Sequence, residues 1–161
     1  MVSKIVYLDN VKAKVKELKL INTFQCRPCT PSEIDKLEGW IHGLLPMAYK
    51  EFLLWMGHND GGGFLQGSER LYYDLTTIQE GAVDLLEENG FPEPFPPDAF
   101  VFFMHQGYQF AYFRLSEGDD PPVYYYLEGQ PTIERVKEHY SGWLLEWAEV
   151  LEKLRNCRKG T

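Results

Sequence analysis

Apolar residues recur with helical spacing between residues 44 and 63, which read LLPMAYKEFLLWMGHNDGGG. The large apolar positions lie at i, i+3, i+4 and i+7 and therefore share one helix face: Tyr49, Phe52, Leu53 and Met56. Pro46 suits the first helical position, and Gly57 is expected to end the helix in the left-handed conformation. This pattern predicts a buried helix around which the rest of the chain is organised.

The segments before this helix predict two more helices. Residues 11–20 alternate apolar residues with lysines, which fits an amphipathic helix or a strand, and we favour the helix. Residues 25–29 form a connector. Thr30 to Glu33 reads as a capping box with Pro31 at the first helical position, so a second helix begins there and ends near Gly43. It is expected to pack antiparallel to the organising helix.

The segment after the organising helix predicts a turn, short strands and a helix. Residues 58–63 are a glycine-rich corner, and residues 64–65 and 71–73 predict two short strands. A helix follows over residues 77–89, with Thr77 and Glu80 as a capping box and Gly90 as its end. Residues 91–98 contain four prolines and predict a loop.

Hairpin-linked strands and a final helix complete the pattern. Residues 99–105 and 108–114 predict two strands joined by a two-residue turn, and residues 123–127 predict another strand after two prolines. Ser141 is expected to cap a long C-terminal helix. This order predicts a single α+β domain over residues 1–161, with an antiparallel sheet of about five or six strands covered on one face by helices.

Length and composition favour one soluble domain. A chain of 161 residues suits a single core, and 44% hydrophobic residues argue against disorder. No apolar run approaches the ~18 residues of a membrane helix, and the first seven residues lack the features of a secretory signal. Three cysteines, an odd number, do not make a disulfide framework. We therefore expect a cytoplasmic protein that does not engage a membrane.

The net charge of −8 is unevenly distributed. Residues 74–134 contain twelve acidic residues and one basic residue, Arg114, which makes this region unsuited to nucleic acid. It is either a solvated face that maintains solubility or an electrostatic surface for a basic partner. The tyrosines on the predicted strands also allow two interpretations. They pack in the core and across neighbouring strands, or they form an exposed face suited to a protein interface.

Candidates for chemistry are sparse. Cys26 and Cys29 have the spacing of half a zinc site or a redox dithiol, but the chain lacks a matching second pair, so we interpret them as incidental thiols. The nucleotide-binding and hydrolase motifs are absent, and we expect no cofactor, no metal and no enzyme activity. The alternative is a small-ligand or enzymatic pocket near His58, Asp60 and His105.

One set of short motifs carries a family resemblance: Leu45-Pro46, the segment from Tyr49 to Leu53, Asn59 with Gly61-Gly62, the segment from Asp119 to Tyr124, and Ser141 with Trp143-Leu144. Together they resemble the SUKH superfamily over about residues 30–151, leaving residues 1–29 as an N-terminal extension. The founding members are fungal regulators of cell-wall glucan synthesis, and most bacterial members are known or suspected immunity proteins against toxins. The resemblance implies an α+β fold, and it implies no catalytic residues.

These observations together predict a non-catalytic protein-binding domain, an immunity protein or a regulatory adaptor. The expected partner is a protein with a basic surface, such as a toxin domain, and the pattern leaves the oligomeric state open. The expected partner-binding residues are Glu117, Asp119, Asp120, Glu87, Glu88, Tyr108 and Tyr125.

Overall fold

The computed structural model describes residues 6–19, 25–61 and 68–159. The helices are α1 (Asp9–Leu18), α2 (Pro31–Ile41), α3 (Met47–Met56), α4 (Leu75–Glu88) and α5 (Tyr140–Lys159), with short 3-10 helices η1 (Tyr72–Asp74) and η2 (Leu115–Glu117). The strands are β1 (Ser68–Glu69), β2 (Ala99–His105), β3 (Gln109–Arg114), β4 (Val123–Leu127) and β5 (Glu134–Lys137). The strand predicted at residues 64–65 lies outside the described residues.

The five strands form one antiparallel sheet in the order β1-β2-β3-β4-β5, which confirms the α+β prediction. The predicted turn at Gln106 and Gly107 lies between β2 and β3, but β3 begins at Gln109 rather than at residue 108, so three residues separate the two strands. Gln106 and Gly107 both have positive φ, 51° and 76°, and the Tyr108 N–H donates to the His105 carbonyl at 3.3 Å. Two consecutive left-handed residues match the right-handed twist of the paired strands.

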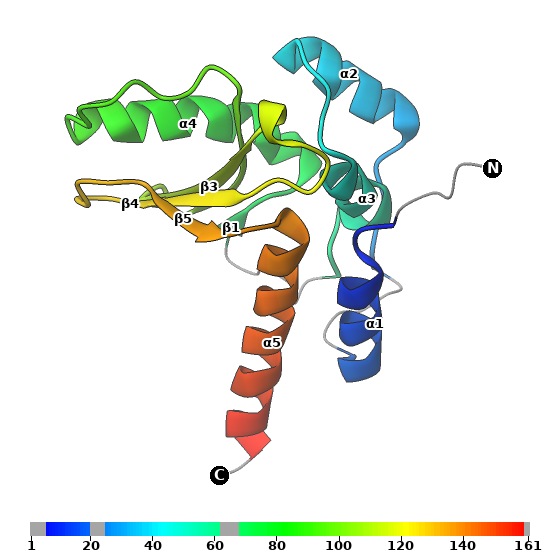
Figure 1. The fold of residues 1–161 in the computed structure, drawn as a ribbon. Helices are drawn as coiled ribbons and strands as arrows, with labels where there is room; N and C mark the ends of the chain where they lie inside the picture. Colours follow the sequence, from blue (N-terminus) through cyan, green and yellow to red (C-terminus); the bar gives the residue numbers. More distant parts are fainter. Residues whose placement is uncertain (1–5, 20–24, 62–67, 160–161) are drawn as a thin grey trace.

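Helices cover both faces of the sheet, so the expectation of one covered face was wrong (Figure 1). Phe103 of β2 packs edge-on against Trp143 of α5, at 5.2 Å between ring centroids, whereas Met104 lies against Gly81 of α4. The second face is closed because α4 and the loop after it return over the sheet. The five consecutive buried residues of β2, 100–104, fit a strand enclosed on both sides.

Helix α3 lies at the centre of the aromatic core, as predicted. The Tyr49 ring lies within 6.3 Å, centroid to centroid, of five other aromatic rings: Phe52, Phe100, Phe102, Phe113 and Tyr140. Tyr49 is fully buried, and its hydroxyl has no hydrogen-bond partner in the described part of the chain. Apolar packing around this ring therefore holds α3 against the sheet and α5.

The end of α3 differs from the prediction. Gly57 has φ −62° and ψ −25°, a right-handed conformation, so the expected left-handed cap was wrong. The glycine is needed for space, since a Cβ atom there would lie 2.4 Å from Cys29 Sγ and 2.7 Å from the Leu53 carbonyl oxygen. The 25–29 connector runs this close because the Cys29 N–H donates to the Leu53 carbonyl at 2.8 Å.

Helix starts were predicted correctly where the cap is local in sequence. The Thr30 hydroxyl accepts from the Glu33 N–H, and the Glu33 carboxylate accepts from the Thr30 N–H, which completes the predicted capping box of α2. By contrast, α4 begins at Leu75 rather than at residue 77. The Asp74 carboxylate accepts from the Arg70 and Leu71 N–H groups, and this turn forms η1 at residues 72–74 where a strand was predicted over residues 71–73.

The start of α5 depends on a residue that is distant in sequence. Ser141 lies inside the helix, so its predicted role as N-cap was wrong. Instead, the Asp120 carboxylate accepts from the Ser141 N–H at 2.9 Å and from the Ser141 hydroxyl at 2.6 Å. From there α5 runs past the sheet beside α1 (Figure 1). None of the helices in the described ranges is long and apolar enough to cross a membrane.

Candidate protein-binding site

The three acidic residues of the 117–120 loop have different surroundings. The Glu117 carboxylate accepts from the Tyr124 hydroxyl at 3.0 Å, and the Asp120 carboxylate caps α5. The side chain of Asp119 is exposed, while its backbone carbonyl accepts from the Ala48 N–H at 2.9 Å. Their part in partner binding stays a prediction, but only Asp119 presents a carboxylate without a bond to the described part of the fold.

Within residues 74–134, most of the acidic side chains that the fold leaves unengaged lie on α4 and on the loop that follows. Four exposed carboxylates fall at i, i+4, i+7 and i+8 of the helix, and a fifth follows in the loop: Glu80, Asp84, Glu87, Glu88 and Glu93. Within the described residues, none of the five makes an ion pair or a side-chain hydrogen bond. Helix α4, LTTIQEGAVDLLEE, also contains no basic residue that could neutralise them.

This arrangement is unfavourable for the isolated protein. Like charges four residues apart, as in Glu80 with Asp84 and Asp84 with Glu88, repel by about 0.2–0.5 kcal/mol per pair. Glu87 and Glu88 also lie in the last turn of α4, where the helix dipole disfavours negative charge by about 0.3–1 kcal/mol. A cationic group placed over these carboxylates would reduce both penalties.

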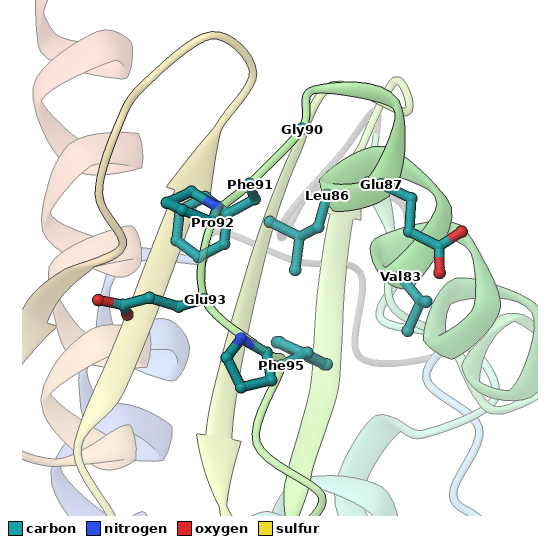
Figure 2. Close-up of a pocket in the computed structure, with 9 residues that line it drawn as sticks. Val83, Leu86, Glu87, Gly90, Phe91, Pro92, Glu93 and Phe95 are labelled. Atoms are coloured by element: carbon teal, nitrogen blue, oxygen red, sulfur yellow. The ribbon is translucent and has the colours of Figure 1, made fainter.

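An open groove of about 570 Å³ lies between α4 and the proline-rich loop (Figure 2). We call it the acidic groove, and its lining residues are Val83, Leu86, Glu87, Gly90, Phe91, Pro92, Glu93, Pro94 and Phe95. Figure 2 shows Glu87 on the helix and Glu93 on the loop at opposite sides of the apolar side chains between them. The groove therefore combines an apolar floor with a carboxylate on each rim.

Local turn geometry and aromatic packing hold the groove open. Gly90 has φ 62°, and the Phe91 N–H donates to the Leu86 carbonyl at 2.9 Å, which ends α4 as predicted and reverses the chain. Phe91 then packs edge-on against Tyr126, and Phe95 packs edge-on against Tyr112. These contacts seat the loop on the sheet while leaving a hollow beside the helix.

The strand tyrosines divide between packing and exposure. Tyr112 and Tyr126 are buried, which confirms the core interpretation for these two, and burial raises the pKa of Tyr112 to about 12. Tyr108 and Tyr125 are partly exposed. Because side chains alternate along a strand, Tyr125 points to the opposite face of the sheet from Tyr126, which contacts the groove loop. Tyr125 is therefore not part of the acidic groove.

The alternative pocket near two histidines and an aspartate receives no support from the described residues. His58 Nε2 lies 2.6 Å from a Glu33 carboxylate oxygen, and the His58 ring packs against Tyr72. The buried Asp60 carboxylate accepts from the Arg70 guanidinium at 2.6 Å, while His105 packs against the neighbouring Tyr108 ring at the hairpin. The three side chains thus have separate partners.

The cysteine pair is also poorly suited to metal or thiol chemistry. Burial raises the pKa of Cys29 to about 12, and it also raises that of Cys26, so neither thiol is ionised at neutral pH. Cys29 belongs to the core rather than to an exposed loop. In the part of the chain that the structure describes, no group of three or more His, Cys, Asp or Glu side chains is placed to hold a metal.

The sequence pattern predicted only part of this site. Glu87 and Glu88 were among the predicted residues, whereas Glu80, Asp84 and Glu93 were not. The helical spacing of the acidic residues on α4, together with an acidic residue in the proline-rich loop that follows, could have indicated these positions. The groove itself could not be found in this way, because it depends on how the loop packs against the sheet.

The fold and the groove define an α+β domain that carries an acidic groove on its surface. The model of the SMI1 / KNR4 family (SUKH-1) matches residues 28–146 of the chain. The chain belongs to this family, which confirms the resemblance seen in its motifs. A comparison with curated proteins found no match. The matched range includes α4 and the whole acidic groove.

Proposed function

We propose that the protein is a non-catalytic binding domain that engages a protein partner with a basic surface. The observation that carries this proposal is the set of five exposed carboxylates on α4 and the following loop, which have no intramolecular partner among the described residues. Opposite charges across an interface accelerate encounter and exclude wrong partners. An acidic surface around an apolar floor fits a basic protein better than a small molecule.

Family membership supports this class of function. The family generally consists of non-enzymatic immunity proteins and regulators, and neutralisation of toxins is common among its bacterial members. A toxin domain with a basic surface is therefore the first candidate partner, and a regulatory adaptor role is the form that the fungal members suggest. In both cases the chain acts by occupying a surface of its partner.

A paired pull-down from the native host tests the proposal. One bait is the wild-type chain, and the other carries Glu87→Lys and Glu93→Lys, which reverse the two rims of the groove. We expect a basic protein that binds the first bait and not the second. With purified partner, association should slow as salt rises, because exposed charges are screened beyond about 8–10 Å at physiological ionic strength.

A matched variant controls for net charge. Glu128→Lys with Glu149→Lys makes the same change in net charge at exposed positions outside the groove, one after β4 and one on α5. This variant should retain the partner. Loss of binding in both double variants would show that the effect comes from net charge rather than from the groove. Binding that does not change with salt or with either double variant would refute the proposed surface.

A further inference from the structure

A second hollow continues the acidic groove towards α2. Its volume is about 500 Å³, and it shares Val83 and Phe95 with the groove. Beyond these two residues it is lined by mainly apolar side chains from the end of α2, from α4, from the loop, from β2 and from η2: Trp40, Ile41, Gln79, Pro96, Pro97, Ala99, Phe100 and Leu115. We call it the Trp40 hollow. None of the residues that line it is charged.

Trp40 is unusually exposed for a tryptophan at a hollow. Its exposed fraction is 48%, and that of the neighbouring Val83 is 39%. Helix α2 buries Ile34 and Leu37 against the core and ends at His42 in the left-handed conformation, with φ 54°. This places Trp40 away from the buried stripe of the helix. Tryptophan is among the residues that most often dominate binding energy when a partner covers them.

The two hollows lie in sequence along α4. Gln79 lines the Trp40 hollow and Glu87 lines the acidic groove, and a rise of 1.5 Å per residue separates them by about 12 Å along the helix. A partner helix spans this distance in about eight residues, and an extended segment does so in about four. One short segment can therefore reach both hollows.

We infer that the Trp40 hollow receives a large apolar side chain from the same partner segment whose Lys or Arg side chains lie over Glu87 and Glu93. The occupant is thus an amphipathic basic segment. This inference rests on the proposed function and specifies the partner it requires. Charge complementarity favours this occupant. An acidic segment would be repelled by the two unpaired carboxylates at the rims, and a second copy of the chain, with its net charge of −8, would be repelled by the first.

Designed peptides test the inference without the natural partner. The first peptide carries leucines on one helical face and lysines on the other. The second keeps the lysines but replaces the leucines with serine, and the third keeps the leucines but replaces the lysines with glutamate. Affinity is measured by fluorescence anisotropy. We expect the Leu/Lys peptide to bind at least about tenfold more tightly than the Ser/Lys peptide, and the Leu/Glu peptide not to bind.

Protein variants separate the two hollows. Trp40→Ala should weaken the Leu/Lys peptide about tenfold and leave the Ser/Lys peptide unchanged, because only the leucines reach the Trp40 hollow. Glu87→Gln with Glu93→Gln should weaken both lysine peptides. Leu54→Ala is the matched control, since Leu54 is 46% exposed on α3 but does not line the hollow, and it should bind every peptide like the wild type.

Each failure points to a different step. If Trp40→Ala binds the Leu/Lys peptide like the wild type, the inference is overturned while the proposed acidic surface stands. If neither lysine peptide binds, or the Gln double variant binds both unchanged, the proposed function fails as well. Dimerisation of the protein alone that Trp40→Ala abolishes would identify a second copy as the occupant, which also overturns the inference.

Discussion

Gly57 provides the sharpest test of how the core is assembled. Its φ of −62° suits alanine, so Gly57→Ala brings no backbone strain. The added Cβ atom, however, would lie 2.4 Å from Cys29 Sγ and 2.7 Å from the Leu53 carbonyl oxygen, and that oxygen accepts hydrogen bonds from Cys29 and Gly57 N–H groups. Overpacking and a weakened hydrogen bond cost about 3 kcal/mol. Alanine also reduces the entropy of the unfolded chain relative to glycine, which raises the unfolding free energy by about 0.5–1 kcal/mol.

We therefore expect Gly57→Ala to lower the free energy of unfolding by roughly 2 kcal/mol in urea titration. Gly39→Ala is the matched control, because nothing lies within 4 Å of its Cβ position in the middle of α2, and it should raise stability by about 0.5–1 kcal/mol. Adding Cys29→Ala to Gly57→Ala should cost less than the sum of the two single changes, since the sulfur is then gone. A neutral or stabilising Gly57→Ala would refute the close approach of the connector.

Three further expectations concern single side chains. Asp120→Ala should lower the unfolding free energy by about 1–2 kcal/mol, because it removes the cap of α5. Asp119→Ala should be neutral, and equal effects of the two changes would show that the cap contributes nothing. Tyr49→Phe should raise the unfolding free energy by about 1 kcal/mol, because it removes a buried hydroxyl without a partner, and a clear loss in calorimetry would contradict this. The hydrogen bonds from the Thr30 N–H and from His58 lower the pKa of Glu33, so the ionised Glu33 contributes stability at pH 7 that is lost as pH falls below the ordinary value of 4.5. The difference in unfolding free energy between the wild type and Glu33→Gln should therefore close over that range. A difference that does not depend on pH would contradict the assignment.

Features that depend on neighbouring residues were predictable from the sequence. The spacing of Tyr49, Phe52 and Met56 predicted the buried face of α3, because a helix places residues i, i+3 and i+7 on one side whatever surrounds it. The capping box at the start of α2 and the hairpin turn at Gln106 and Gly107 follow from short-range hydrogen bonds and backbone preferences. The family resemblance carried by short motifs was confirmed for the same reason: it is a property of the sequence itself.

Short or weakly patterned elements were harder to predict. Strand β5 was missed because its four residues, ERVK, are mostly exposed and lack clear alternation. Residues 71–73 resembled a strand because tyrosine favours sheets, yet Asp74 binds the backbone of this turn and converts it into η1. In both places local propensity was too weak to compete with the surrounding contacts.

The candidate site shows most clearly what only the tertiary structure decided. Composition predicted an acidic region over residues 74–134, but the contacts of the fold engage Glu117 with Tyr124 and Asp120 with α5. The carboxylates left exposed are concentrated on α4 and the following loop, and the groove forms because Phe91 and Phe95 anchor that loop to the sheet. Whether a carboxylate is engaged depends on a partner 7 residues away for Glu117 and 21 residues away for Asp120, and the packing of strands and helices determines such pairings.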